Sequence, residues 1–295
     1  MIVRSLALTT ELALAAMRGR VTDRSDYLVV ETPENPGYYD GNVLVLPAPP
    51  QVGEVTYWTR RFVDELGKNP AIKHVSLWWD GTNGDQGAVA ELQAAGFTLM
   101  SNQVMIAERA TRAGEQAATY VASIDSAVDS AVPAALLRAP AEPGLATAAL
   151  PIRALTPDEV LSTADLTYTI GDRHDDSYRL FLERRAMWHR DLVGRGDAMF
   201  WGAFEPTRED PGEALVASLG LVWLGKLARY QDVQTLPTHR RRGLAGALLT
   251  TSSREAFARG TERVVIIAEP DSEAARVYAR LGFRTVERTV NARRV

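Results

Sequence analysis

Short apolar runs alternate with amphipathic stretches along the second half of the chain, a pattern typical of a mixed α/β fold. Runs rich in β-branched and aromatic residues predict strands, and helical periodicity predicts helices. The expected strands are 198–205, 215–223, 228–236, 263–268 and 285–290, and the expected helices are 157–165, 177–192, 244–259 and 272–281. This order predicts a mostly antiparallel sheet with a crossover near its end.

The first half contains a similar series of elements. A strand-like run at 73–79 is followed by a helical run that ends at Gly96-Phe97. In the second half, the run at 263–268 is followed by a helix that ends at Gly282-Phe283. The glycine suits a left-handed helix end, and the phenylalanine packs back on the helix that it terminates. The matching order and spacing favour an internal repeat.

Segment 107–151 differs in character from both halves. It is rich in alanine, carries several prolines and loses its periodicity after about Val132, which indicates a linker in its second part. Its first part, at 119–128, is compatible with a strand of the first half. We therefore expect a first domain at 1–130, a linker at 131–151 and a second domain at 152–295.

Composition and charge exclude several classes of protein. The 295 residues suffice for two domains, and a formal net charge of -4 argues against nucleic acid as a partner. The absence of cysteine excludes disulfides, thiolate catalysis and cysteine-based metal sites. The four histidines lack tight ligand spacing, so no metal is expected; they are His74, His174, His189 and His239.

No apolar run reaches the length of about 18 residues that a transmembrane helix needs, so no membrane partner is expected. The run at 6–17 resembles a signal peptide weakly, but Glu11 interrupts it and no clear basic start precedes it. An amphipathic helix is the favoured interpretation, and a cytoplasmic location is the expectation. No heptad or exposed apolar stripe indicates an oligomer.

The most informative stretch is a glycine-rich turn between the strand-like run at 230–236 and the helix-like run at 247–259. Its residues are Arg240, Arg241, Arg242, Gly243, Leu244, Ala245 and Gly246. Unpaired backbone N–H groups and the helix dipole converge at such a turn, glycine allows close approach, and arginine adds charge. The turn therefore predicts a phosphate or diphosphate site. A basic surface patch is the alternative, and His239 before it is expected to be an exposed turn residue.

At these residues the second half resembles the GNAT superfamily of acyl-CoA-dependent N-acyltransferases. The superfamily's R/Q-x-x-G-x-G/A motif corresponds to Arg240 through Ala245. A later motif of Asn, Ala and Tyr before Gly-Phe corresponds to Asp271, Ala274 and Tyr278, with Asp in place of Asn as a departure. The resemblance covers roughly 152–295, and the two motifs occur in the right order on the expected elements.

The resemblance implies acetyl-CoA as cosubstrate, with the turn from Arg240 to Gly246 holding its diphosphate. The backbone of Val233, Gln234 and Thr235 would pair with the pantetheine amides, and the Val233 N–H would polarise the thioester carbonyl. Asp271 and Ala274 would also lie at the cofactor. Tyr278 takes the position of the family's general acid, since a phenol can protonate a departing thiolate. The alternative for Tyr278 is plain packing at a helix end.

The general base and the acceptor site have weaker signals. Asp232 and Glu269 are the two candidate bases, and ordered water is an equal contender. The loop 171–176 offers Asp172, Asp175 and Asp176, three carboxylates that would attract a cationic amine. Helix capping by Asp175 or Asp176 is the alternative. The large aromatics are interpreted as core or pocket lining, namely Trp188, Trp201 and Trp223, and Arg184-Arg185 is expected to be a solvated helix face.

The first half resembles a decayed copy of the same domain. Where the glycine-arginine turn would be sought, the chain reads Pro49-Pro50-Gln51-Val52-Gly53-Glu54-Val55. It has one glycine, and Glu54 would repel phosphate. The sequence thus predicts two GNAT-like α/β (α+β) domains in tandem, each with a mixed, mostly antiparallel sheet flanked by helices. The expected activity is acetyl transfer to a primary amine of a small molecule. Protein N-terminal or lysine acetylation and non-catalytic acyl-CoA sensing remain alternatives.

Overall fold

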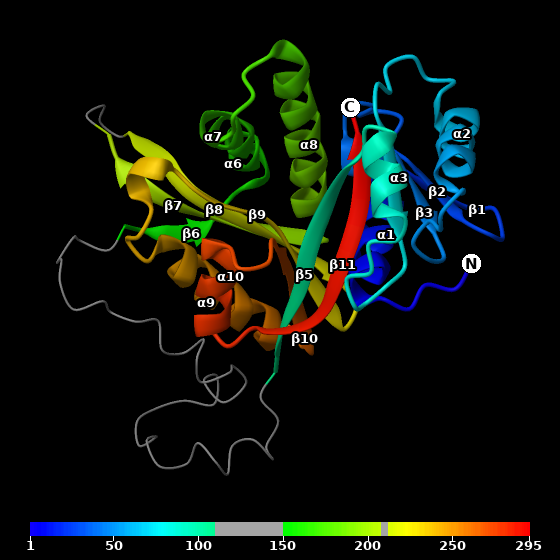
Figure 1. Ribbon diagram of the computed structural model, residues 1–295. Coiled ribbons are helices and arrows are strands. Elements are labelled where there is room, and N and C mark those ends of the chain that lie inside the picture. Colours follow the sequence, from blue (N-terminus) through cyan, green and yellow to red (C-terminus); the bar gives the residue numbers. More distant parts are fainter. Residues whose placement is uncertain (110–149, 208–211) are drawn as a thin grey trace, which may run out of the picture. The chain divides into compact units, whose positions relative to one another are not determined.

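The computed structural model describes residues 1–109, 150–207 and 212–295 (Figure 1). These form two compact units. Unit 1 comprises 1–104, 267–272 and 285–295, and unit 2 comprises 105–266 and 273–284. The possible strand at 119–128 and the linker from 131 to 149 lie outside the described residues, and the domain boundaries expected from the sequence stay a prediction.

Unit 1 contains a sheet with the strand order β1-β2-β3-β4-β11-β5. The pairs of β1 with β2, β2 with β3 and β4 with β11 are antiparallel, whereas β3 and β4 are parallel. The elements are α1 (Leu6–Arg18), β1 (Arg20–Asp23), β2 (Leu28–Glu31), η1 (Tyr39–Gly41), β3 (Val43–Leu46), α2 (Val55–Leu66), β4 (Val75–Trp79), α3 (Val89–Ala94), and most of β5 (Thr98–Glu108) and β11 (Arg284–Arg294).

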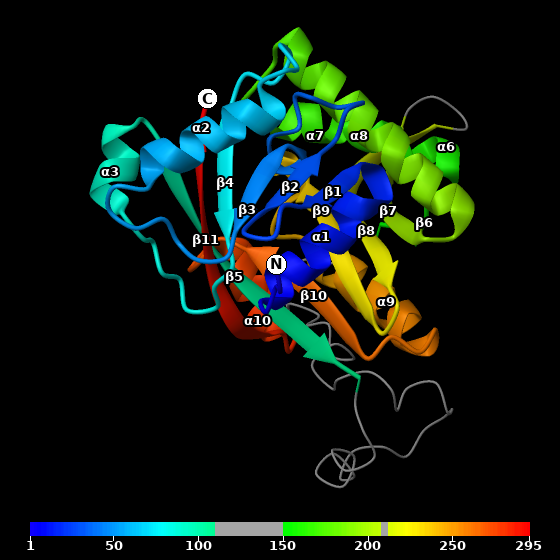
Figure 2. The ribbon, with the colours of Figure 1, turned by 90° about the vertical axis from the view of Figure 1, so that its right-hand side faces the viewer.

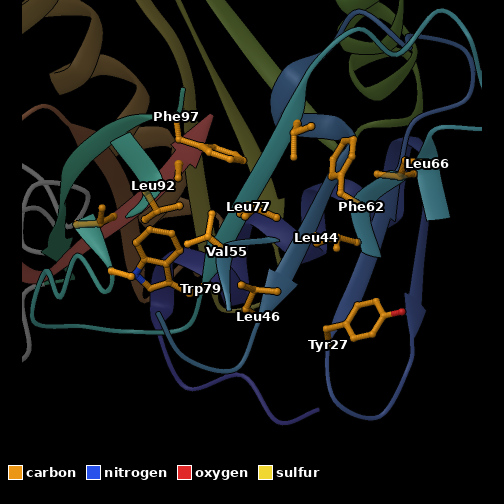
Figure 3. Packing of buried hydrophobic residues seen from close by; sticks show 14 of the residues in the cluster. Tyr27, Leu44, Leu46, Val55, Phe62, Leu66, Leu77, Trp79, Leu92 and Phe97 are labelled. Atoms are coloured by element: carbon orange, nitrogen blue, oxygen red, sulfur yellow. The ribbon is translucent and has the colours of Figure 1, made fainter. Parts of the chain in front are cut away.

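Strands β2, β3 and β4 of unit 1 are apolar on both faces because helices cover both (Figure 2). Leu44 and Leu46 of β3 join a cluster with α2 and α3, whereas Val43 and Val45 join a second cluster with α1. This separation follows from the two-residue period of a strand. Figure 3 shows the first cluster, in which Phe62 of α2 is among the fully buried side chains.

Unit 2 contains strands in the order β5-β10-β9-β8-β7-β6. The pair β10 and β9 is parallel, and the pairs from β9 to β6 are antiparallel. The elements are β6 (Ile152–Ala154), α6 (Pro157–Val160), α7 (Ser162–Ile170), α8 (Asp176–Arg195), β7 (Ala198–Pro206), β8 (Glu213–Leu224), β9 (Leu227–Thr235), η3 (Pro237–His239), α9 (Leu244–Ala258), β10 (Arg263–Ala268) and α10 (Glu273–Arg280). Helices α7 and α8 lie along one side of β7 to β9, and α9 lies along the other (Figure 1).

Local signals explain where the helices of unit 2 begin and end. A capping box joins Thr156 and Glu159 at the start of α6, and Gly196 ends α8 in the left-handed conformation with φ 79°. The single helix expected at 157–165 consists of two pieces, α6 and α7, which are separated at Leu161. Within the described residues, no helix has the length and apolar character needed to cross a bilayer.

The two units share a repeated series of elements. In each, a strand, a helix and a second strand form a parallel pair, β3-α2-β4 in unit 1 and β9-α9-β10 in unit 2. In each, a short helix then ends at Gly-Phe, with Gly96 at φ 82° and Gly282 at φ 89°. The repetition and the mostly antiparallel strand pairs confirm the predicted fold class.

Candidate functional site

Strand β9 has an irregular ladder at the residues expected to meet the cosubstrate. Its parallel register with β10 covers Leu227–Arg229, whereas its register with β8 continues to Thr235. Between Gln231 and Gln234 the register shifts, so that Asp232 and Val233 both lie opposite Leu219. This arrangement is a β-bulge, which turns backbone groups out of the regular ladder. The far part of β9 thus has backbone groups available on the side away from β8.

Helix α9 begins at a turn that leaves its first amides open. Gly243 is the N-cap residue, at φ 78°, and within the described residues no side chain caps this helix. A Cβ built at Gly243 or at Gly246 meets no atom within 4 Å, so both glycines border open space. Arg241 also has a positive φ, at 61°. The start of α9 therefore combines unpaired N–H groups, the positive end of the helix dipole and free volume.

The arginines of this turn differ in their contacts. Arg240 is exposed and its Nε donates a hydrogen bond to the Thr235 carbonyl at 3.4 Å. Arg242 Nη1 lies 3.9 Å from Glu205 Oε1, and Arg241 is exposed. All three arginines are exposed, so the turn carries positive charge that solvent-borne anions can reach.

The expectation that His239 is exposed was wrong, because its side chain is buried. Its Nε2 lies 3.1 Å from Glu205 Oε2 on β7, and its Nδ1 is 2.9 Å from Thr238 Oγ1. A carboxylate distant in sequence thus lies beside the residue that precedes the arginines, which is a contact that local sequence does not reveal.

Tyr278 lies on α10 with 5% of its surface exposed. Burial, and then the nearby Tyr230, raise the pKa of Tyr278 to about 12. Its ring packs on Phe283 at 6.1 Å, and within the described residues its hydroxyl makes no hydrogen bond. By contrast, the buried Tyr230 hydroxyl lies 2.9 and 2.7 Å from the Ser252 and Ser253 hydroxyls. Tyr278 is therefore a buried phenol that keeps its proton and has its donor unused.

Asp232, the first candidate base, is already engaged. Its Oδ1 lies 3.2 Å from Arg185 Nη1, and its Oδ2 lies 3.8 Å from His189 Nδ1. Only 18% of the Arg185 side chain is exposed, so Arg185 is not part of a solvated helix face as the sequence suggested. Sequence reasoning missed this pair, although Phe181, Arg185 and His189 recur at four-residue spacing on α8 and thus share a helix face.

Three further predicted residues lie just before α10 in the sequence or in its first turn. Glu269 and Asp271 belong to the segment 267–272 of unit 1, and both are exposed. The Glu269 carbonyl accepts a hydrogen bond from Ser272 Oγ at 2.8 Å, and Asp271 has a positive φ of 58°. Ala274 is exposed in the first turn of α10 in unit 2.

In the loop expected to meet the acceptor, Asp175 is the N-cap of α8 and accepts a hydrogen bond from the Tyr178 amide at 2.9 Å. Hydrogen bonds from Ser177 Oγ and the Tyr178 amide lower the pKa of Asp175 to about 2. Asp176 begins the helix, and Asp172 is exposed. The capping interpretation is thus confirmed for Asp175.

In the equivalent turn of unit 1, side-chain carboxylates accept hydrogen bonds from the backbone amides. Between β3 and α2, Glu54 accepts a hydrogen bond from the Gln51 amide at 2.9 Å, and Glu91 accepts one from the Gly53 amide at 2.6 Å. The ladder of β3 with β4 reaches the last residue of both strands, Leu46 and Trp79. The cluster of Figure 3 includes three side chains from this region, namely Trp79, Val55 and Leu92. Carboxylates take the amides that a phosphate would need.

Comparisons with known proteins give one family match and several structures of similar fold. Residues 225–292, which include the turn, α9 and Tyr278, match the family of FR47-like proteins. A functionally unknown conserved protein from Staphylococcus epidermidis is similar in structure, with a TM-score of 0.64 and 13% identity over 94% of each chain. A GCN5-related N-acetyltransferase from Kribbella flavida has a TM-score of 0.55 and 14% identity, over 100% of this chain and 96% of that one.

A GCN5-related N-acetyltransferase from Sphaerobacter thermophilus is also similar, with a TM-score of 0.55 and 15% identity over 96% of this chain and 84% of that one. No curated protein matches the chain significantly. Residues 225–292 thus resemble FR47-like proteins, and the chain as a whole shares its fold with these GCN5-related N-acetyltransferase structures.

Proposed function

We propose that the protein is an N-acetyltransferase that uses acetyl-CoA to acetylate a primary amine of a small molecule. The observation that carries this proposal is the open start of α9. There, Gly243 and Gly246 leave free volume in front of uncapped amides, immediately after the bulged strand β9. A site of that kind suits a diphosphate.

The residues present fit coenzyme A. The amides from Leu244 to Gly246 would hold the diphosphate, and Arg240, Arg241 and Arg242 would add charge. The backbone of β9 from Val233 to Thr235, which extends past the register with β10, would pair with the pantetheine amides. Ala274, exposed at the start of α10, leaves room for the ligand, and Asp271 stays a candidate cofactor contact.

When bound, acetyl-CoA would supply a thioester carbonyl that an amine can attack directly. The Val233 amide lies within the bulge, and it would donate a hydrogen bond to that carbonyl oxygen. Tyr278 would donate a hydrogen bond to the departing sulfur. Because the pKa of Tyr278 is about 12, the phenol is protonated throughout the neutral range, and stabilisation of the thiolate by this donor precedes any full proton transfer.

Removal of the amine proton has three candidates. Asp232 is tied to Arg185 at 3.2 Å, which occupies one of its oxygens. Glu269 is exposed, so its carboxylate can accept a proton from a group in solvent. Ordered water serves an amine that is partly neutral at working pH. The engagement of Asp232 favours Glu269 or water as the acceptor of the proton.

The acceptor is the least constrained part of the proposal. Asp172 and Asp176 are exposed carboxylates near the start of α8 that would attract a cationic amine, whereas Asp175 is used by the helix cap. A protein N-terminus or lysine is the second acceptor class. A non-catalytic acyl-CoA sensor is the alternative function, and the unused donor of Tyr278 speaks against it.

The experiment is to incubate the full chain with acetyl-CoA and a panel of small amines and peptides, and to follow release of free thiol. We expect one class of small amines to raise the rate far above hydrolysis. If acetyl-CoA binds but no amine or peptide raises the rate, the sensor function replaces the enzyme. If peptides alone raise it, the acceptor is a protein.

A further inference from the structure

The backbone of Asp232 adopts a conformation that its residue type seldom takes. Its φ is 46°, in the left-handed region that glycine favours, although asparagine and aspartate enter it more readily than most residues. The residue sits inside the β9 bulge, where Asp232 and Val233 face the single residue Leu219. Such a conformation persists only when surrounding contacts hold it. The direction of the Val233 amide follows from it, because the two residues share a peptide bond.

The contacts that hold Asp232 come from one face of α8. Arg185 Nη1 lies 3.2 Å from Asp232 Oδ1, and the same guanidinium lies 5.1 Å from the centre of the Phe181 ring. One turn further, His189 Nδ1 lies 3.8 Å from Asp232 Oδ2. The His189 side chain is 1% exposed, and its ring packs on Phe200. The Asp232 carboxylate is thus held between a cation and a ring that have little freedom to move.

We infer that Arg185 is a positioning residue, which holds Asp232 in its left-handed conformation and so aims the Val233 amide. The carboxylate of Asp232 then acts as an anchor of the backbone. This inference rests on the proposed function, because it assigns the amide a bound thioester as its target. An anchoring role of Asp232 can be distinguished from base catalysis by experiment. If the carboxylate only anchors the backbone, a residue that adopts the same backbone conformation without Arg185 can replace Asp232.

Glycine is that residue, because it takes a positive φ without steric cost. The test compares Arg185→Ala, Asp232→Gly and the double variant, each in the full chain. Arg190→Ala is the matched control, because its guanidinium lies on the same helix, 3.6 Å from the exposed Asp191. Arg185→Lys keeps the positive charge but loses the planar set of guanidinium N–H donors, and it replaces Arg185→Ala in the test if that variant does not fold.

Two measurements are needed, and neither requires an acceptor. Isotope-edited infrared spectroscopy of ¹³C-acetyl-CoA reports the carbonyl stretch, which moves to lower frequency when an N–H polarises the carbonyl. Calorimetry reports the affinity for acetyl-CoA. We expect Arg185→Ala to lose the shift at nearly unchanged affinity, and Arg185→Ala/Asp232→Gly to regain it. With an amine substrate, Arg185→Ala should lower kcat roughly tenfold with little change in the KM for acetyl-CoA.

The inference is overturned if the carbonyl stretch of Arg185→Ala equals that of Arg190→Ala, or if glycine at position 232 restores nothing in the Arg185→Ala background. An intact infrared shift in the parent protein, without thiol release from any amine, leaves the positioning role standing and rejects the enzyme. Absence of any shift in the parent protein rejects the role of the Val233 amide, and the positioning role with it.

Discussion

Leu92 and Tyr278 occupy the same position of a repeated helix end. The carbonyl of Leu92 accepts a hydrogen bond from the Phe97 amide at 2.9 Å, and that of Tyr278 accepts one from the Phe283 amide at 3.1 Å. Both side chains are buried, and both glycines of the repeat have positive φ. The two copies therefore keep the same backbone and differ in chemistry, since one presents an alkyl group where the other presents a phenol.

We predict that the intact chain binds one equivalent of coenzyme A, because carboxylates already occupy the amides in the turn of unit 1. In unit 1 the amides of Gln51 and Gly53 already donate to Glu54 and Glu91, so a diphosphate would have to displace two carboxylates and meet their charge. Calorimetry of the full chain should give a stoichiometry near one. A second equivalent that disappears in a Glu91→Gln variant would contradict the assignment of the site to unit 2.

Replacing Gly243 by glutamate should raise the Kd for coenzyme A by about 100-fold or more, about 2.7 kcal/mol. The new side chain would fill the open space before α9 and bring a negative charge to the diphosphate. Gly225→Glu is the matched control, because Gly225 has φ 67° and also borders open space, but lies in the turn between β8 and β9. Equal affinities of the two variants would remove the diphosphate from the start of α9.

Tyr278→Phe should lower kcat and leave the affinity for acetyl-CoA within about twofold, since the donor is used only as the thiolate departs. The ring, its burial and its packing on Phe283 are kept by this change. Steady-state kinetics together with calorimetry separate the two effects. Loss of affinity equal to the loss of turnover would instead assign Tyr278 to cosubstrate binding.

The burial of the Tyr278 phenol can be tested by comparing the unfolding free energies of the wild type and Tyr278→Phe. The pKa of Tyr278 is raised from 10.0 to about 12 in the folded state, so its contribution is fully present below pH 10 and is lost as the pH rises towards 12. Phenylalanine does not titrate. The wild type should therefore lose up to about 2.7 kcal/mol of unfolding free energy relative to Tyr278→Phe between pH 10 and 12. Urea unfolding at several pH values measures the difference, and a constant difference would show an exposed phenol.

Asp175 can be tested for its two roles separately. Asparagine is a good N-cap without charge, whereas alanine caps poorly. Asp175→Ala should lower the melting temperature by roughly 2 °C, and Asp175→Asn should keep it. Because its carboxylate already accepts from Tyr178 and Ser177, Asp175→Asn should leave the KM for a cationic acceptor nearly unchanged. An increase in that KM, with stability kept, would return Asp175 to the acceptor site. Asp172→Asn is the companion variant.

Most elements of unit 2 were predictable because their signals are local. The strand expected at 198–205 corresponds to β7 (Ala198–Pro206), and the helix expected at 244–259 corresponds to α9 (Leu244–Ala258). The last strand, which lies mostly in unit 1, is longer than expected, since β11 extends to Arg294. Its final residues pair with β4 in register from Asn291 to Arg294. Polar residues there conceal the strand, because their partner lies over 200 positions away in sequence.

The candidate site was predictable to the same extent. The open turn at Gly243 and the helix end at Tyr278 lie within short stretches with distinctive residue spacing, and residues 225–292 match a family on those stretches. The partners of Asp232 and His239 were not predictable. Arg185 and Glu205 reach them from other elements, and nothing in the neighbouring sequence marks either contact.

The amino-acid sequence by itself determined the order of strands and helices, the glycine positions that need a positive φ, and the turn where backbone amides are left open. These properties depend on side-chain periodicity and on backbone sterics within a few residues. Only the tertiary structure decided that Arg185 engages Asp232, that His239 is buried beside Glu205, and that carboxylates close the turn of unit 1. Those outcomes depend on distances between residues far apart in the chain, which packing alone sets.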